Sequence, residues 1–187
     1  NSGRRQRQMC IRDSFQPFHN GHAYLLNRAF EFAGENEVVI AIGSASKGWE
    51  SNNPWTLEER KLMIEAWLKS NKKIATIVGI DDIDDYPNWV KHASKHHGDG
   101  VLVTSDEGAK ELYESDNFPV EFVDLANREN LEGWRVRQTL LMLSTVYDDN
   151  AVREVLTATV PRPVIDWLIE NDAIFRLSTM VAGVNVG

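Results

Sequence analysis

The chain has 187 residues, 42% of them hydrophobic and 26% charged, which is typical of a folded globular protein and excludes a largely disordered one. Twenty basic and 28 acidic residues give a net charge of −8, which argues against a general binder of DNA or RNA but allows a local site for a small phosphorylated ligand. The longest apolar run, Val38–Ile42, is too short to span a membrane, and the single cysteine, Cys10, excludes a disulfide scaffold and indicates a cytoplasmic location.

The first fourteen residues, NSGRRQRQMCIRDS, differ in character from the rest of the chain. They contain four arginines and the cysteine, with almost no apolar pattern, and no apolar stretch follows that would complete a signal peptide. Residues 8–14 match the translation of a transposase adapter used in DNA library preparation. We therefore predict that residues 1–14 are a non-native segment and leave them out of the fold. A genuine basic tail is the alternative.

From residue 15 onward, helical patterns alternate with buried strands. Apolar residues at helical spacing predict a helix over 21–33, and the continuous apolar run after it predicts a strand buried on both faces over 37–43. Thr56 and Glu59 have the spacing of a capping box, which predicts the start of the next helix. The other expected elements are strands over 74–80, 101–103 and 120–123, and helices from about 87, over 107–113, over 133–143 and on either side of Pro161 and Pro163.

This alternation predicts an α/β fold, a Rossmann-like parallel sheet with helices on both faces. We expect residues 15–187 to form a single domain, with a helical C-terminal part from about residue 133. Ligands of such sheets bind at the carboxyl ends of the strands, which is where the motif-bearing loops of this sequence fall.

The most informative segment is Phe15-Gln-Pro-Phe-His-Asn-Gly-His22. His22 opens the first helix, whose free amides and dipole favour a phosphate, and Gly21 permits close backbone approach. His19 and His22 can both donate to a phosphoryl group as charge develops on it. Because the segment offers no nucleophile, it indicates direct phosphoryl or nucleotidyl transfer. The alternatives are a loop histidine with a helix-cap histidine, or a zinc pair, which lacks a third ligand nearby.

FQPFHNGH resembles the signature of the HxGH nucleotidyltransferase superfamily. Within it, the chain resembles archaeal-type nicotinamide-nucleotide adenylyltransferases, which usually open with GRFQPFHxGH. Further blocks follow in that family's order over most of residues 15–143. They are Gly43-Ser-Ala45, Asn53-Pro-Trp-Thr-x-x-Glu-Arg60, Asp82-Ile83 with Trp89-Val90, and the arginines Arg128 and Arg137.

The resemblance implies the nucleotidyltransferase fold and the transfer of an adenylyl group from ATP to nicotinamide mononucleotide (NMN), giving NAD and pyrophosphate. It implies that His19 and His22 are catalytic and that Mg²⁺, or a similar divalent cation, accompanies ATP without an assigned protein ligand. The implied ATP-binding residues are Phe15, Gln16, Phe18, Gly21, Gly43, Ser44, Arg128 and Arg137. Lys47, in a loop where the family varies, is a further candidate for ATP binding. The implied NMN-binding residues are Asp82 and Trp89, although a tryptophan at a helix start is as often a core residue.

Two motifs depart from the family pattern, at three positions. The arginine that precedes the Phe of FQPF is replaced by Ser14, which lies within the suspected adapter. The late motif has Glu132 and Trp134 in place of hydroxyl residues. A carboxylate beside a triphosphate repels it, so we expect Glu132 to turn toward Arg135 or Arg128, or ATP binding to be weak.

Two other functions stay open. The chain could be another HxGH enzyme, such as a pantetheine-phosphate adenylyltransferase or a cytidylyltransferase, or a catalytically weakened module that binds nicotinamide nucleotides. It could also be part of a fused protein, for instance one with a Nudix domain. In each case we expect small-molecule ligands, no nucleic-acid or membrane partner, and a homo-oligomer.

Overall fold

The computed structural model describes residues 7–126 and 128–180, and these fall into two compact units. Unit 1 contains the described residues up to Ser14, Ala23–Ala45 and Ile74–Ala126. Unit 2 contains Phe15–His22, Ser46–Lys73 and the described residues from Arg128 onward.

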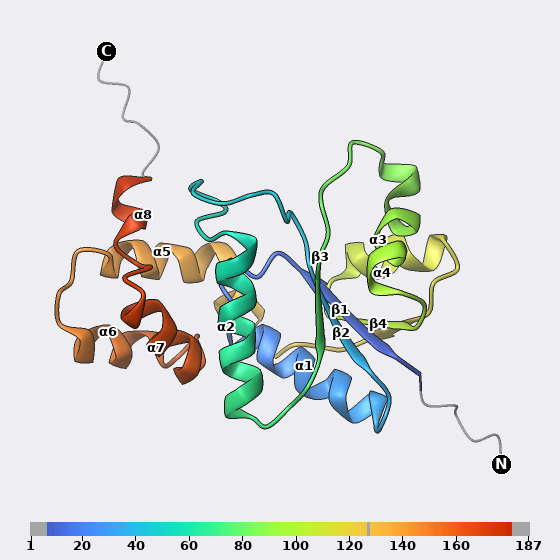
Figure 1. The fold of residues 1–187 in the computed structure, drawn as a ribbon, viewed down its shortest axis with the longest axis horizontal. Helices are drawn as coiled ribbons and strands as arrows, with labels where there is room; N and C mark the ends of the chain where they lie inside the picture. The colour runs from blue at the N-terminus through green and yellow to red at the C-terminus, as the bar shows by residue number, and fades with distance from the viewer. Residues whose placement is uncertain (1–6, 127, 181–187) are drawn as a thin grey trace. The chain divides into compact units, whose positions relative to one another are not determined.

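Unit 1 is built on a five-stranded parallel sheet, as the alternation of strands and helices predicts (Figure 1). The strand order is β3-β2-β1-β4-β5. The strands are β1 (Met9–Asp13), β2 (Val38–Ile42), β3 (Thr76–Gly79), β4 (Val101–Thr104) and β5 (Val120–Phe122). The connecting helices are α1 (Asn20–Ala33), α3 (Trp89–His97) and α4 (Glu107–Ser115), with a 3₁₀ turn, η1 (Tyr86–Asn88), before α3.

The middle strand, β1, is formed by residues that we expected to lie outside the fold. Residues 9–13 pair in parallel with all of β2, and Met9 and Cys10 also pair with β4. The prediction that residues 9–13 lie outside the fold is therefore wrong. A central strand buried on both faces requires no alternation of polar and apolar residues, so the short run Met9-Cys-Ile11 is sufficient. The adapter origin of the segment stays a prediction, and residues 1–6 lie outside the described part of the chain.

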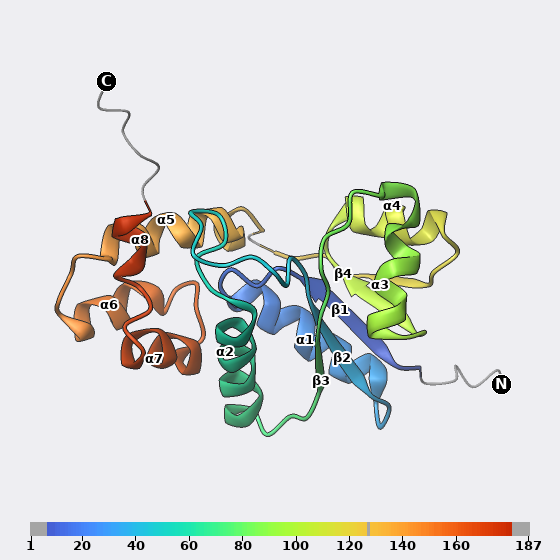
Figure 2. The same ribbon diagram turned by 45° about the horizontal axis from the view of Figure 1, so that its top comes forward.

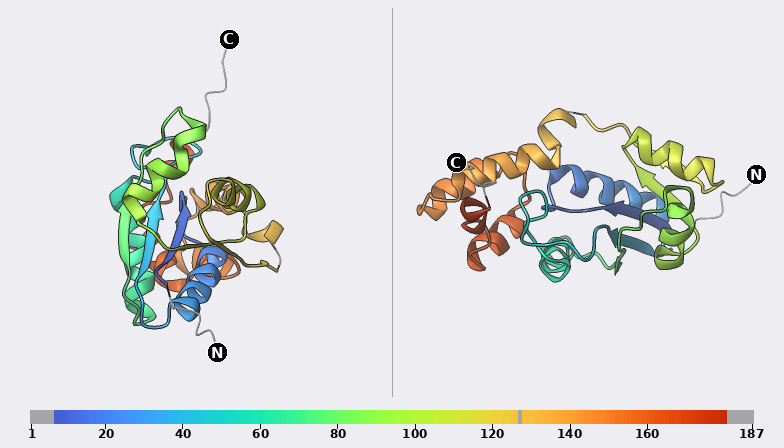
Figure 3. Two further views of the ribbon diagram at one scale, coloured as in Figure 1. Left: turned by 90° about the vertical axis from the view of Figure 1, so that its right-hand side faces the viewer. Right: turned by 90° about the horizontal axis from the view of Figure 1, so that it is seen from above.

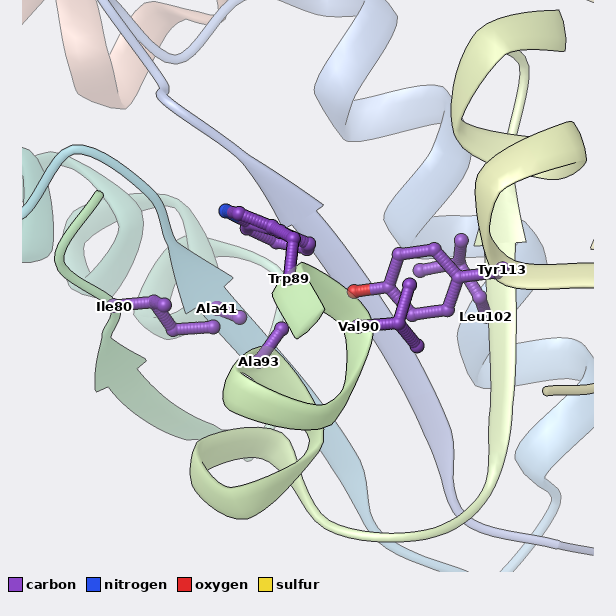
Figure 4. Packing of buried hydrophobic residues seen from close by; sticks show 7 residues of the cluster. All are labelled: Ala41, Ile80, Trp89, Val90, Ala93, Leu102 and Tyr113. Atoms are coloured by element: carbon purple, nitrogen blue, oxygen red, sulfur yellow. The ribbon is translucent and has the colours of Figure 1, made fainter. Parts of the chain in front are cut away.

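The helices α3 and α4 share one apolar cluster with the sheet (Figure 4). Trp89 and Val90 begin α3, Tyr113 projects from α4, and Leu102 lies on β4. All of these side chains are buried, and the Trp89 and Tyr113 rings meet edge to face at 6.2 Å. This packing fixes the start of α3 against the sheet.

Unit 2 consists of helices (Figures 2 and 3). They are α2 (Leu57–Ser70), the 3₁₀ turn η2 (Arg128–Leu131), α5 (Gly133–Leu143), α6 (Asp149–Leu156), α7 (Arg162–Glu170) and α8 (Arg176–Thr179). The capping box of α2 is confirmed: the Thr56 hydroxyl accepts from the Glu59 amide, and the Glu59 carboxylate accepts from the Thr56 amide. Helix α2 packs against α7, and α6 also contacts α7. The helical C-terminal part, beginning at Gly133, is confirmed.

None of the helices in the described parts of the chain is both long and apolar enough to cross a membrane.

Candidate active site

His19 and His22 lie together in unit 2 at the start of α1. Their rings stack with centroids 3.7 Å apart, and both are buried, with 6% and 4% of their surface exposed. The amide of Gly21 donates to Nδ1 of His19 at 3.0 Å, and the amide of His19 donates to Nδ1 of His22 at 3.1 Å.

These two bonds fix the protonation pattern of the pair. An imidazole nitrogen that accepts a hydrogen bond carries no proton, so the proton of each neutral ring sits on Nε2. Both rings therefore have Nε2 as the donor nitrogen. Two donors side by side, held by backbone amides, can stabilise charge that builds up on a phosphoryl group.

The structure gives a more specific reason for a glycine at position 21 than the close approach of a phosphate. A Cβ atom at this position would lie 2.8 Å from Cε1 and 3.0 Å from Nδ1 of His19. Side chains do not approach that closely, so only glycine leaves room for the His19 ring in this orientation.

Gln16 and Arg137 connect the motif to other parts of unit 2. The Gln16 amide group donates to the Trp55 carbonyl at 2.9 Å and accepts from the Trp55 amide at 3.0 Å. Arg137 Nη1 donates to the Gln16 carbonyl at 2.9 Å. The Trp55 indole donates to the Ala173 carbonyl at 2.9 Å. The Gln16 side chain thus holds the backbone, and a ligand contact from it requires breaking these bonds.

The other predicted ATP-binding residues of unit 2 differ in exposure. Phe15 and Phe18 are fully buried, with Phe15 against His22 at 4.6 Å and Phe18 against Trp67 at 5.5 Å between ring centroids. Their side chains are core residues, so only their backbone can meet a ligand. Lys47 and Arg128 are exposed, and Lys47 Nζ lies 3.8 Å from the Glu50 carboxylate.

The Glu132 side chain turns toward Arg135, as the sequence analysis expected for a carboxylate that does not repel ATP. Its carboxylate lies 3.9 Å from Arg135 Nε and accepts from the Trp134 indole N–H. The Arg135 guanidinium in turn lies over the Trp134 ring, 4.5 Å from its centroid. Glu132 and Trp134, which both depart from the family's late motif, thus contact one another, and α5 begins at Gly133 as predicted.

In unit 1 the structure brings together Ser44 and Asp82 at the carboxyl ends of β2 and β3. The Ser44 hydroxyl donates to the exposed Asp82 carboxylate at 2.8 Å. Ser44 has a positive φ of 46°, and the amide of Gly43 before it donates to the Asp13 carbonyl at 2.8 Å. A strained backbone at a loop of this kind is typical of functional positions.

Trp89 is mainly a core residue in this structure. It is 8% exposed within the cluster of Figure 4, and the Arg12 guanidinium lies over its ring at 4.0 Å from the centroid. Stacking of a nicotinamide ring on that face would require Arg12 to move.

The sequence did not indicate the ion pair of Glu59 with Arg176. The two guanidinium nitrogens donate to the two carboxylate oxygens at 2.7 Å each. Burial alone would raise the pKa of the Glu59 carboxyl, but hydrogen bonds from Arg176 and Thr56 outweigh it, and the pKa lies below its usual value. The one signal in the sequence was that Glu59 and Arg60 end the NPWTxxER block, which marks both residues as part of the motif. Arg60 is fully buried, and it donates to the Thr56 and Lys47 carbonyls.

The described residues contain no group of three or more His, Cys, Asp or Glu side chains placed to hold a metal ion.

The sequence profile of the cytidylyltransferase-like family matches residues 13–139, which include both histidines, Gln16 and Arg137. This match covers more than half of the chain, and the chain belongs to that family of nucleotidyltransferases.

Within the family, the chain is similar to archaeal nicotinamide-nucleotide adenylyltransferases, which confirms the resemblance stated from the motifs. The chain is 35% identical to the enzyme of Picrophilus torridus over 68% of this chain and 75% of that one. It is 30% identical to the enzyme of Methanosarcina acetivorans over 90% and 91% of the two chains.

Solved structures confirm the fold. A bifunctional NMN adenylyltransferase/ADP-ribose pyrophosphatase from Francisella tularensis, complexed with AMP and a manganese ion, is similar with a TM-score of 0.60 and 20% identity. The match covers 88% of this chain and 52% of that one, so this chain spans about half the length of that structure.

Proposed function

We propose that this protein transfers the adenylyl group of ATP to nicotinamide mononucleotide, producing NAD and pyrophosphate. The observation that carries the proposal is the stacked pair His19 and His22, in which backbone amides donate to both Nδ1 atoms and Nε2 is the donor nitrogen of each ring. The naming of its archaeal relatives supports the same reaction.

The reaction needs positioning and charge stabilisation rather than a covalent intermediate. A phosphate oxygen of NMN attacks the α-phosphorus of ATP in line, and the bond from that phosphorus to the β-phosphate oxygen breaks. His19 and His22 donate to the oxygens on which charge increases, and Arg137, Lys47 and Arg128 are the cations proposed for the triphosphate. A divalent cation, Mg²⁺ in this proposal, would neutralise part of the phosphate charge.

The acceptor side of the proposal rests on Asp82 and Trp89. Asp82 presents an exposed carboxylate fixed by Ser44, which can accept from the nicotinamide amide or a ribose hydroxyl. Trp89 is proposed to border the nicotinamide ring. Gly43, with Gly21, is proposed to contact ATP through the backbone. A cytoplasmic location and a homo-oligomeric state belong to this proposal as well.

The test is product analysis with purified protein, ATP and a magnesium salt. NMN should give NAD and an equal amount of pyrophosphate, whereas 4′-phosphopantetheine as acceptor, or CTP in place of ATP, should give little. Turnover with one of those substrates and none with NMN would replace the proposal by another activity of the family. Tight NMN binding without pyrophosphate release would identify a binding module.

A further inference from the structure

Arg176, near the end of the described chain, joins separate parts of unit 2 at one buried point. Only 9% of it is exposed. Besides its paired bonds to Glu59 on the first turn of α2, its Nη1 donates to the Pro54 carbonyl at 3.3 Å. A two-point bond between a planar guanidinium and a carboxylate fixes direction as well as distance.

The same guanidinium supports Trp49. Its Cζ lies 3.9 Å from the centroid of the Trp49 ring, although that side chain is 59% exposed. Trp49 also has a positive φ of 55°, which is costly for a residue with a side chain. A cation over an aromatic face attracts the ring, so the stack on Arg176 favours this position of the Trp49 side chain.

Trp49 begins a tight turn that ends at Pro54. The Trp49 amide donates to the Pro54 carbonyl at 3.2 Å, and the backbones of Glu50 and Asn53 exchange hydrogen bonds at 3.1 and 3.0 Å. We call residues 49–54 the Trp49 turn. The Arg176 guanidinium therefore contacts both ends of the Trp49 turn: it stacks on the Trp49 ring and donates to the Pro54 carbonyl.

The tip of the Trp49 turn lies on a cavity. Ser51 and Asn52 line about 350 Å³ of space, together with Arg137 and Trp134 of α5 and Leu177 of α8. Arg137 is the cation that also bonds to the Gln16 carbonyl of the FQPFHNGH motif. The turn thus brings two polar side chains to the cavity that Arg137 lines.

We propose that Arg176 is a positioning residue for the reaction: through Trp49 and Pro54 it holds Ser51 and Asn52 beside Arg137, where they take part in binding the triphosphate of ATP. This inference rests on the proposed function. Arg176 is not expected to contact ATP; it keeps the turn ordered before ATP arrives, so that binding does not have to order it.

Two variants disturb the turn in different ways. Arg176→Lys retains the positive charge but loses the two-point bond and the flat surface under Trp49. Trp49→Ala loses only the stack, leaves the ion pair with Glu59 intact and keeps a Cβ atom at the strained backbone position. Arg162→Lys, at an exposed arginine of α7 paired with Asp166, is the matched control.

We expect both variants to raise the KM for ATP about tenfold, because the turn must then be ordered during binding. The KM for NMN and kcat should change less than about twofold, and Arg162→Lys should behave like the unaltered protein. Trp49→Ala should leave the melting temperature nearly unchanged, which separates positioning from loss of fold. Equal increases in both KM values, or an unchanged KM for ATP in both variants, would overturn the inference.

Hydrogen exchange gives a readout that does not depend on turnover. The amides of Trp49, Glu50 and Asn53, which are bonded within the turn, should exchange faster in both variants. Affinity for a non-hydrolysable ATP analogue, measured by calorimetry, should fall about tenfold. If the unaltered protein makes no NAD but these two changes appear, the proposed function fails and the positioning role stands. If exchange or affinity stays unchanged in both variants, the positioning role fails.

Discussion

Replacing His22 by asparagine separates its two roles. In the structure Nδ1 of His22 accepts from the His19 amide, and Nε2 is the donor proposed to act on phosphate. The Oδ1 atom of asparagine lies close to the position of Nδ1, so His22→Asn retains an acceptor for the buried amide but has no donor at the Nε2 position. His22→Ala removes both.

The magnitudes expected for the two variants differ. Loss of one donor that acts mainly in the transition state typically lowers kcat by about 100- to 1,000-fold, or about 2.7–4 kcal/mol. Both variants should show this loss with little change in ATP affinity. His22→Ala should in addition lower the free energy of unfolding by about 1–3 kcal/mol, because it leaves the buried His19 amide unsatisfied. His22→Asn should lose much less of that stability.

Initial rates of pyrophosphate release and urea denaturation curves measure the two effects independently. His19→Asn provides a parallel case, because an asparagine side chain readily accepts from the amide two residues later, here that of Gly21. A loss in kcat smaller than tenfold for both asparagine variants would return the histidines to a structural role. The donor assignment would also be refuted if the loss in kcat paralleled the loss in stability, so that it was large in the alanine variant and small in the asparagine variant.

Three further predictions concern single features of the site and the core. Burial lowers the pKa of His97, so as pH falls below 6.5 the unfolded state takes up a proton before the folded state does. The free energy of unfolding should therefore drop by up to about 1.4 kcal/mol per pH unit. Urea denaturation at several pH values should show this slope, and His97→Gln should flatten it. Gly21→Ala should lower kcat at least about tenfold by displacing the His19 ring, even though alanine favours helices by about 1 kcal/mol; full activity would mean that the ring moves without consequence. The double change Glu132→Ser with Trp134→Thr, which restores the family's hydroxyl residues, should lower the KM for ATP and raise the rate; unchanged kinetics would show that this stretch does not contact the triphosphate.

The sequence predicted the elements that local signals define. The capping box of Thr56 and Glu59 and the helix from Gly133 are specified within a few neighbouring residues, and the structure has both. The strand at Met9–Asp13 was missed because a short buried strand has no internal periodicity, and because its adapter-like composition argued against it.

The contacts that organise the candidate site could not be predicted in the same way. Arg176 and Glu59 are separated by 117 residues along the chain, and Trp55 and Ala173 by 118, so nothing in either local sequence indicates the partner. The motif did predict that His19 and His22 belong together. It did not predict that Phe15 and Phe18 would be fully buried, because motifs record which residues occur together and not which way they face.

The interleaving of the two units has a consequence for synthesis on the ribosome. Each unit is made of three stretches of chain, and the last stretch of unit 2 begins only after all of unit 1. Trp55 and Glu59 emerge more than a hundred residues before Ala173 and Arg176, which complete their contacts. Such distant contacts form slowly, because a long loop must close before they can stabilise anything. The stretch containing His19 and His22 is thus translated well before Ala173 and Arg176, and the unit that holds it reaches its final structure only after those residues have been made.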